Sequence, residues 1–187
     1  MEDIVLYLDV ETNGIGTFRP ATQRIMQISW IYNENEYDYY VNDVEEISDK
    51  LPHDLTPEYC KTNGVDFDTP IDLLYRHLQH CDKIVGHNVL FDIGCILHEL
   101  KIRKHRLYRA IKRLFIDFSD SNDIFCTMEN TVDVCKIPLS ATKYKFPKLG
   151  ELYHHMFMTS PESLGTLHDS ITDCRVTKAC YEKLKNL

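Results

Sequence analysis

The chain has 187 residues, enough for one domain with a hydrophobic core, and we expect a single domain over residues 1–187. Its net charge of −8 argues against indiscriminate binding to nucleic acid, and no apolar run is long enough to span a bilayer. The short, acidic N-terminal stretch is unlike a signal peptide. We therefore expect an intracellular, cytoplasmic protein that has no membrane partner.

The seven cysteines are an odd number and include no CxxC pair. Most lie among apolar neighbours, which predicts reduced thiols in the core. Cys81 with His77 and His80 is the one grouping that suggests a metal cluster, but no second pair of ligands completes a zinc site.

The pattern of apolar residues predicts strands first and then an alternation of strands and helices. Buried or alternating apolar residues predict five strands, at 4–10, 24–31, 36–41, 83–86 and 124–126. Helical spacing and helix-start residues predict helices at 56–62, from Pro70 onward, at 90–100, from the end of the fifth strand to about Cys135, at 147–158, and from Asp169 onward. This order predicts an α/β fold with a mixed sheet and helices on its faces.

Two carboxylates, Asp9 and Glu11, end the first predicted strand. Side chains at positions i and i+2 of a strand lie on one face, so these two like charges are close and repel each other. They are either two solvated acids at the end of a surface strand or ligands of a divalent cation, which prefers carboxylate oxygens.

Two further acids favour the second interpretation. Asp92 begins the helix at 90–100, and Asp173 lies on the inward-facing stripe of the last helix. A carboxylate on an inward face is costly unless something positive receives it. His168 lies just before the last helix, and we expect Asp169 to be its N-cap rather than a ligand.

The segments LDVET, HNVLFD and HDSITD resemble the three motifs of the DnaQ-like 3′–5′ exonucleases, in the branch with four acids and a histidine (DEDDh). The segments IFCTMENTVDVCKIP and YKFPKLGELYHHMF resemble the polymerase III epsilon-type members of that family. Order and rough spacing agree across nearly the whole chain. The resemblance implies an RNase H-like fold, with a central mixed five-stranded sheet whose second strand is antiparallel to the others.

The resemblance also implies an activity: metal-dependent hydrolysis of phosphodiester bonds from the 3′ end of a nucleic acid, with release of 5′-mononucleotides. Asp9, Glu11, Asp92 and Asp173 match the family's metal ligands. They would hold two Mg²⁺ or Mn²⁺ ions about 4 Å apart, which clamp the scissile phosphate. His168 matches the general base that takes the proton from the attacking water, a task that suits an imidazole.

Family members hold the terminal nucleotide with residues near these motifs, and the matching positions are Thr12, His87, Asn88 and Phe91. Asn88 is alternatively a helix cap, and Phe91 is alternatively a core residue. Phe146 stands where the family segment usually has tryptophan, which keeps an apolar ring at that position.

Several alternatives stay open. The analogy favours single-stranded or frayed 3′ ends of DNA, with a possible polymerase or replication partner and a location at sites of replication, but an RNA exonuclease has the same fold. A binding module that does not cut and a phosphoesterase of small nucleotides are weaker alternatives. The segment 101–113 contains seven Lys or Arg and no acid, so it is either a solvated helix face or a contact with the phosphates of an upstream strand.

Overall fold

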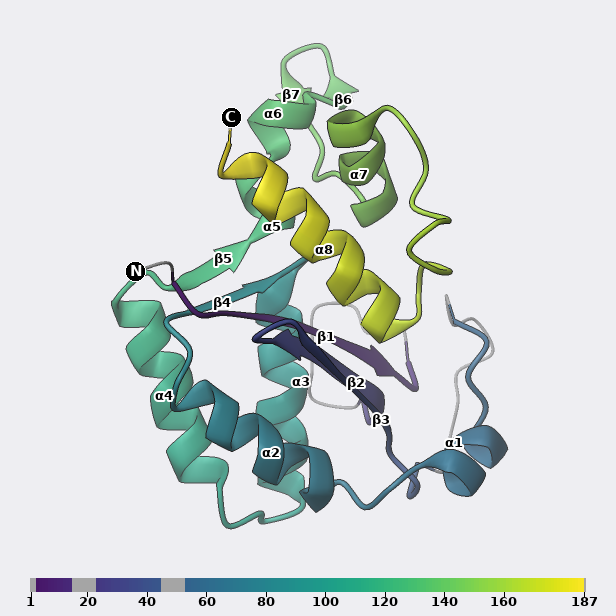
Figure 1. The fold of residues 1–187 in the computed structure, drawn as a ribbon, viewed down its shortest axis with the longest axis vertical. Helices are drawn as coiled ribbons and strands as arrows, with labels where there is room; N and C mark the ends of the chain where they lie inside the picture. Colours follow the sequence, from purple (N-terminus) through teal and green to yellow (C-terminus); the bar gives the residue numbers. More distant parts are fainter. Residues whose placement is uncertain (1–2, 15–22, 45–52, 187) are drawn as a thin grey trace.

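The computed structural model describes residues 3–14, 23–44 and 53–186. They build a five-stranded sheet with strand order β3-β2-β1-β4-β5 (Figure 1). Its strands are β1 (Val5–Thr12), β2 (Ile25–Tyr32), β3 (Asn35–Tyr40), β4 (Lys83–Gly86) and β5 (Ile124–Cys126). β2 is antiparallel to both β1 and β3, whereas β1, β4 and β5 run parallel. The predicted mixed sheet is thus confirmed, including the direction of its second strand.

The helices are α1 (Pro57–Asn63), α2 (Asp68–Leu78), α3 (Val89–Ile102), α4 (Tyr108–Asp120), α5 (Thr127–Asn130), α6 (Val132–Cys135), α7 (Leu149–Phe157) and α8 (Ser170–Leu184). A small hairpin of β6 (Pro138–Ser140) and β7 (Lys143–Tyr144) precedes α7. The predicted helices are present with ends shifted by one or two residues, except that the region after β5 forms two short helices. Helix α4 and the β6–β7 hairpin are additional to the elements predicted.

The alternation of residues along β1 divides its side chains between two layers. Leu6, Leu8 and Val10 belong to the main core, which they share with α2, α3 and α4. Tyr7 faces the other way and packs in a second cluster with Cys174 of α8. Because Asp9 and Glu11 continue the alternation of Tyr7, they lie on the α8 side of the sheet.

A close contact at Gly86 determines where α3 begins. A Cβ atom at this position would lie 2.9 Å from the carbonyl oxygen of Leu8 and 2.7 Å from Cβ of Val89, so glycine is required for the tight turn from β4 into α3. The last parallel pair between β1 and β4 is Tyr7 with Val85. Beyond that pair β4 has ended, and α3 starts beside the acidic end of β1.

The cysteines are free thiols, and all except Cys135 are buried, as predicted. Cys81 donates a weak hydrogen bond to the carbonyl of Leu78, and His77 accepts one from Trp30 Nε1. Within residues 3–14, 23–44 and 53–186, the acidic, His and Cys side chains close enough to hold a metal ion do not include these two residues. The suggested cluster around Cys81 is therefore not formed.

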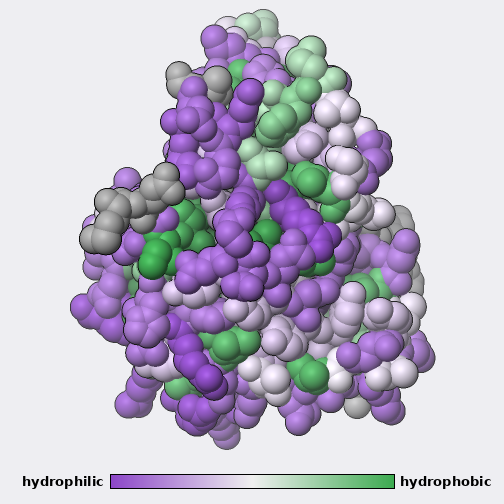
Figure 2. All heavy atoms as spheres, in the orientation of Figure 1, coloured by the Kyte–Doolittle hydropathy of each residue, from purple (hydrophilic) through white to green (hydrophobic). Residues whose placement is uncertain are grey.

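None of the helices that the structure describes is long and apolar enough to cross a bilayer. The face of the molecule in Figure 2 is mostly hydrophilic, and its apolar residues form separate patches, one of them over α7.

Candidate active site

Four acidic side chains from three elements come together at the end of β1. Asp9 and Glu11 come from β1, Asp92 from the first turn of α3, and Asp173 from the first turn of α8. Burial raises the pKa of Asp9 well above its usual range, and the charges of Asp92, Asp173 and Glu11 raise it further. The structure thus places the four acids that the sequence singled out near one another. Among the described residues, however, the group whose ligand atoms lie close enough to hold one metal ion is Glu11, Asp173 and His168, without Asp9 and Asp92.

At neutral pH the acids cannot all be ionised in the metal-free protein. Glu11 is 8% exposed, and burial together with the charges of Asp173 and Asp169 raises its pKa to about 8. Burial also raises the pKa of Asp173 to about 7, although the backbone N–H of His168 opposes this by donating to Oδ1 at 3.3 Å. The cluster therefore stores protons that a cation would displace.

Asp92 supplies the observation that tests whether a metal fits this site. Its side chain is buried, and burial raises its pKa, while the backbone N–H of Val10 acts in the opposite direction. Its Oδ2 atom is buried and has no hydrogen-bond partner within the described part of the chain. A buried carboxylate oxygen without a donor, among other acids, fits a hard divalent cation such as Mg²⁺ or Mn²⁺.

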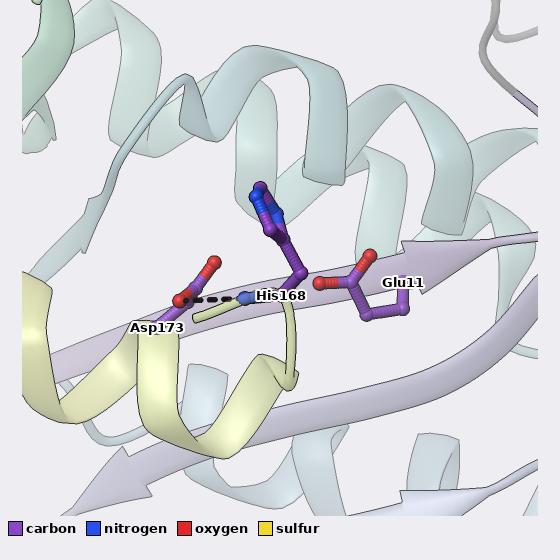
Figure 3. Close-up of side chains that lie close together, drawn as sticks. All are labelled: Glu11, His168 and Asp173. Carbon is purple, nitrogen blue, oxygen red and sulfur yellow. Dashed lines mark hydrogen bonds between the residues drawn. The ribbon is translucent and has the colours of Figure 1, made fainter. Parts of the chain in front are cut away.

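His168 lies between Glu11 and Asp173, as Figure 3 shows. One ring nitrogen and one carboxylate oxygen of each acid all lie within 4.8 Å of one another. The residue has a left-handed backbone with φ +67° just before α8 begins. Partial burial lowers the pKa of His168, and the nearby His53 and Lys148 add to this effect. The imidazole is therefore a free base near neutral pH, placed either to accept a proton or to bind a cation.

The start of α8 is fixed by a buried glutamine, Gln27, which the sequence did not single out. Asp169 occupies the N-cap position as expected, but its carboxylate accepts from Gln27 Nε2 at 2.7 Å and from Thr172 Oγ1 at 2.8 Å rather than from a backbone N–H. Gln27 Oε1 in turn accepts from the backbone N–H of Ser170. Because Gln27 pairs with Glu11 across the β1–β2 ladder, this network sets the position of α8 relative to Glu11.

A second histidine, His53, supports the site from the other side and was also missed. Its buried Nδ1 accepts from the backbone N–H of Leu55 at 3.2 Å, so the proton of the neutral ring is on Nε2. Nε2 then donates to the carbonyl of Thr12 at 2.9 Å and lies 4.0 Å from Glu11 Oε2. His53 thereby ties the end of β1 to the segment before α1.

His87, expected to touch substrate, has protein partners at both ring nitrogens. Nδ1 lies 3.0 Å from Thr127 Oγ1, and Nε2 lies 3.0 Å from the carbonyl oxygen of Pro147. Burial lowers the pKa of His87 to about 4, which keeps the ring neutral. In this arrangement His87 supports the segment before α7.

The other expected substrate contacts divide between buried and exposed positions. Thr12 is buried, and its hydroxyl donates to the carbonyl of Gly14 at 3.0 Å. Phe91 is partly buried and packs against the main core. Asn88 is exposed in a left-handed conformation at the N-cap of α3, where its side chain makes no capping bond. Of these three, Asn88 is therefore the one open to solvent beside the acids.

Two hollows open on either side of His168. The larger has a volume of about 710 Å³, and its lining includes Asp9, Asp173, Asn88 and Phe146. The smaller, of about 510 Å³, lies toward Tyr40. The acidic cluster is thus accessible to a ligand larger than a single ion.

Three of the seven basic residues of the segment 101–113, namely Arg103, Arg106 and Arg113, form ion pairs within the molecule, and the segment does not line either hollow. Arg103 binds the buried Glu99 through Nε at 2.7 Å and Asp43 through both terminal nitrogens, and Arg106 binds Asp72. Arg103 follows Asp92 by eleven residues, about 16 Å along the axis of α3. These ion pairs favour a structural role for Arg103 and Arg106, whereas a contact of the rest of the segment with an upstream strand stays a prediction.

No family model matches the sequence, and no curated protein matches it at a significant level. Solved structures that share its fold include Escherichia coli exonuclease I bound to a dT13 oligonucleotide carrying 5cy, with a TM-score of 0.63 and 18% identity. They also include the same enzyme bound to a dA16 oligonucleotide, at 0.65 and 19%, and exonuclease I from Methylocaldum szegediense, at 0.63 and 15%.

The alignments cover 97–100% of this chain but only 40–41% of the exonuclease I chains. This chain therefore spans about two fifths of the length of these proteins. At such identities the likeness establishes the fold, which is the RNase H-like fold of exonucleases, as expected from the sequence.

Proposed function

We propose that this chain is a metal-dependent 3′–5′ exonuclease of the DEDDh type. It would hydrolyse phosphodiester bonds from the 3′ end of single-stranded or frayed nucleic acid, preferably DNA, and release 5′-mononucleotides. The observation that carries the proposal is the convergence of four acids and His168, with one buried carboxylate oxygen left without a donor, at the end of the first strand of an exonuclease fold.

In this proposal Asp9, Glu11, Asp92 and Asp173 hold two Mg²⁺ or Mn²⁺ ions. The ions supply positive charge to the scissile phosphate and the departing oxygen. The four acids contribute by losing their stored protons when the ions bind, because their raised pKa values make ionisation without a cation costly.

His168 would accept the proton of the attacking water. Its lowered pKa keeps the ring unprotonated at neutral pH, and its backbone N–H, which donates to Asp173, holds it at the site. Thr12, His87, Asn88 and Phe91 remain the proposed contacts of the terminal nucleotide; Asn88 is the most accessible of them, and His87 and Asn88 line the larger hollow. The partner proposed for this site is the nucleic acid strand. Within the described residues, nothing identifies a polymerase or replication partner.

The proposal is tested by incubating strands labelled at the 5′ end, one of DNA and one of RNA, with Mg²⁺, with Mn²⁺ and with EDTA. We expect stepwise shortening with either metal and none with EDTA. Asp9→Asn and Asp92→Asn should abolish cutting, whereas Glu162→Gln, a matched change at an exposed acid outside both hollows, should leave it unchanged.

Undiminished cutting in EDTA would contradict the metal-dependent proposal. Faster shortening of RNA than of DNA would favour the RNA exonuclease. Strand binding without cutting would favour a binding module, and cutting restricted to dinucleotides would favour a phosphoesterase of small nucleotides.

A further inference from the structure

The ring of Phe146 lies in an unusual position for a large apolar side chain. It is 56% exposed and lines the larger hollow, which Asp9, His168 and Asp173 also line. Burial of an aromatic side chain is favourable, so an exposed ring in the same hollow as these charged groups is left available for a ligand that covers it. It is not part of the three core clusters of the described residues.

The backbone on both sides of Phe146 is firmly held. The Lys145 N–H donates to the carbonyl of Ile137 at 2.9 Å, and Lys145 Nζ binds both oxygens of Glu151 at 2.6 and 2.8 Å. Glu151 also accepts from the backbone N–H of Lys148 at 2.8 Å. A ring that is positioned in advance loses little conformational entropy when a ligand packs against it.

His87 adds a third support. Its Nε2 lies 3.0 Å from the carbonyl oxygen of Pro147, the residue that follows Phe146, and its Nδ1 lies 3.0 Å from Thr127. The motif residue next to Asn88 therefore holds the segment that carries Phe146. This contact links the start of α3 to the segment between β7 and α7 (Figure 1).

The lining of the hollow is chemically mixed. Asp9, Asp173 and His168 provide polar groups, Met128, Leu149 and Leu167 provide apolar surface, and the exposed Lys148 provides a positive charge. Its volume of about 710 Å³ lies in the range of sites for ligands of nucleotide size. A nucleotide likewise combines a charged phosphate with a flat apolar base.

We propose that the larger hollow holds a nucleoside of the bound strand, that Phe146 stacks on its base, and that Lys148 contacts an adjacent phosphate. This inference rests on the proposed function, because it uses the acids as the phosphate end of the site. Stacking on a phenyl ring accepts every base, so the contact gives affinity with little sequence preference.

The inference is tested by a double-mutant cycle between the ring and the base. Strands of DNA carrying one abasic residue at the last, second-last or third-last position are bound to wild type and to Phe146→Ala. Binding is measured by fluorescence anisotropy with Ca²⁺, which also binds carboxylate oxygens. Removal of a base at one of these positions should weaken wild-type binding about 5- to 150-fold, the usual range for a stacked base. Phe146→Ala should bind the intact strand about 5- to 150-fold more weakly than wild type does. Its affinity should be the same for the intact strand and for the strand with the abasic residue at that position.

The matched control is Tyr144→Ala, since Tyr144 is also an exposed aromatic residue, lies two residues earlier and does not line the hollow. It should bind all strands as wild type does. Phe146→Trp should retain binding, and its new exposed indole should be quenched by the intact strand but not by the matching abasic strand. Trp30, the one native tryptophan, is fully buried and gives a constant background.

Equal sensitivity of wild type and Phe146→Ala to abasic residues at all three positions would overturn the inference. Because binding is measured with Ca²⁺ and cutting separately with Mg²⁺, the two proposals fail differently. If a strand is bound with the expected coupling but never cut, the exonuclease proposal is wrong and the nucleoside site is supported. If a strand is cut but shows no coupling, the nucleoside site is wrong and the exonuclease proposal is supported.

Discussion

Replacing Glu11 by glutamine is expected to make the metal-free protein less sensitive to alkaline pH. Burial and the charges of Asp173 and Asp169 raise the pKa of Glu11 from 4.5 to about 8. Because the folded-state pKa lies above the unfolded one, the associated stability is fully present below the unfolded pKa and is lost as the pH rises through about 8. Glutamine cannot ionise, so this loss should disappear.

The size of the effect follows from linkage. Each proton that the folded state binds in excess changes the free energy of unfolding by about 1.4 kcal/mol per pH unit. Between about pH 6.5 and pH 8, one such proton at Glu11 therefore accounts for a fall of about 2 kcal/mol. Asp173, with a pKa of about 7, adds a smaller loss in the same window. His87 acts with the opposite sign, since its pKa is lowered to about 4, but its contribution changes mainly below pH 6.5.

The measurement is urea unfolding in EDTA at about pH 6.5 and about pH 8. Wild type and the control Glu162→Gln should lose more than about 2 kcal/mol between the two, and Glu11→Gln should lose about 2 kcal/mol less than either. The loss that remains in Glu11→Gln comes from Asp9, Asp92 and Asp173, whose pKa values are also raised. Adding Mg²⁺ at the higher pH should restore about 3 kcal/mol to wild type at a concentration near 100 times its dissociation constant. A wild type that is equally stable at both pH values, or a Glu11→Gln variant with an unchanged slope, would refute this electrostatic account.

Two further predictions concern His168 and Arg103. His168→Ala should lower the rate of cutting about 10²- to 10⁴-fold while calorimetry shows nearly unchanged metal affinity, because a general base and not a ligand is removed; loss of metal binding would instead make His168 a ligand. For wild type the rate should also fall with acidification only below pH 6.5, since the pKa of His168 is lowered. Arg103→Ala should lower the free energy of unfolding by about 2 kcal/mol in urea titrations, because, among the described residues, the buried Glu99 is then left with Arg24 as its one cationic partner. Unchanged stability together with a weaker salt dependence of strand binding would instead favour a phosphate contact at Arg103.

The sheet could be predicted from the sequence because its strands carry the clearest local signal. Lys83–Gly86 and Ile124–Cys126 are short apolar runs with defined ends, and both were placed with the correct bounds. Helix α4 was not among the predicted helices, although Ile111, Phe115 and Phe118 recur at helical spacing, because the segment 101–113 was considered for its charge. The β6–β7 hairpin was missed because strands of three and two residues are too short to show a period.

The acidic residues of the candidate site were predictable as a set because motif spacing fixes which element carries each of them. Their supports were not predictable, because they depend on contacts between distant parts of the chain. Gln27 and Asp169 are 142 residues apart, and His53 and Thr12 are 41 residues apart, yet each pair is joined by a direct hydrogen bond. Neither Gln27 nor His53 lies in a pattern that distinguishes it from an ordinary polar residue.

In the basic segment 101–113, too, the partners of charged residues could not be predicted from the sequence, because they lie in distant parts of the chain. Counting charges along the chain made 101–113 a candidate for binding phosphate, but Arg103 neutralises Asp43, which lies 60 residues earlier, and the buried Glu99 one turn before it. Those positive charges are used about 16 Å along α3 from Asp92, so they do little to offset the acids at the end of β1. In the proposed function, the positive charge that receives a phosphate would come from cations held at the acids and from Lys148 in the hollow that Phe146 lines. Metal binding at the acids and Lys148 at the nucleoside site would thus both place positive charge beside the phosphates of a bound strand.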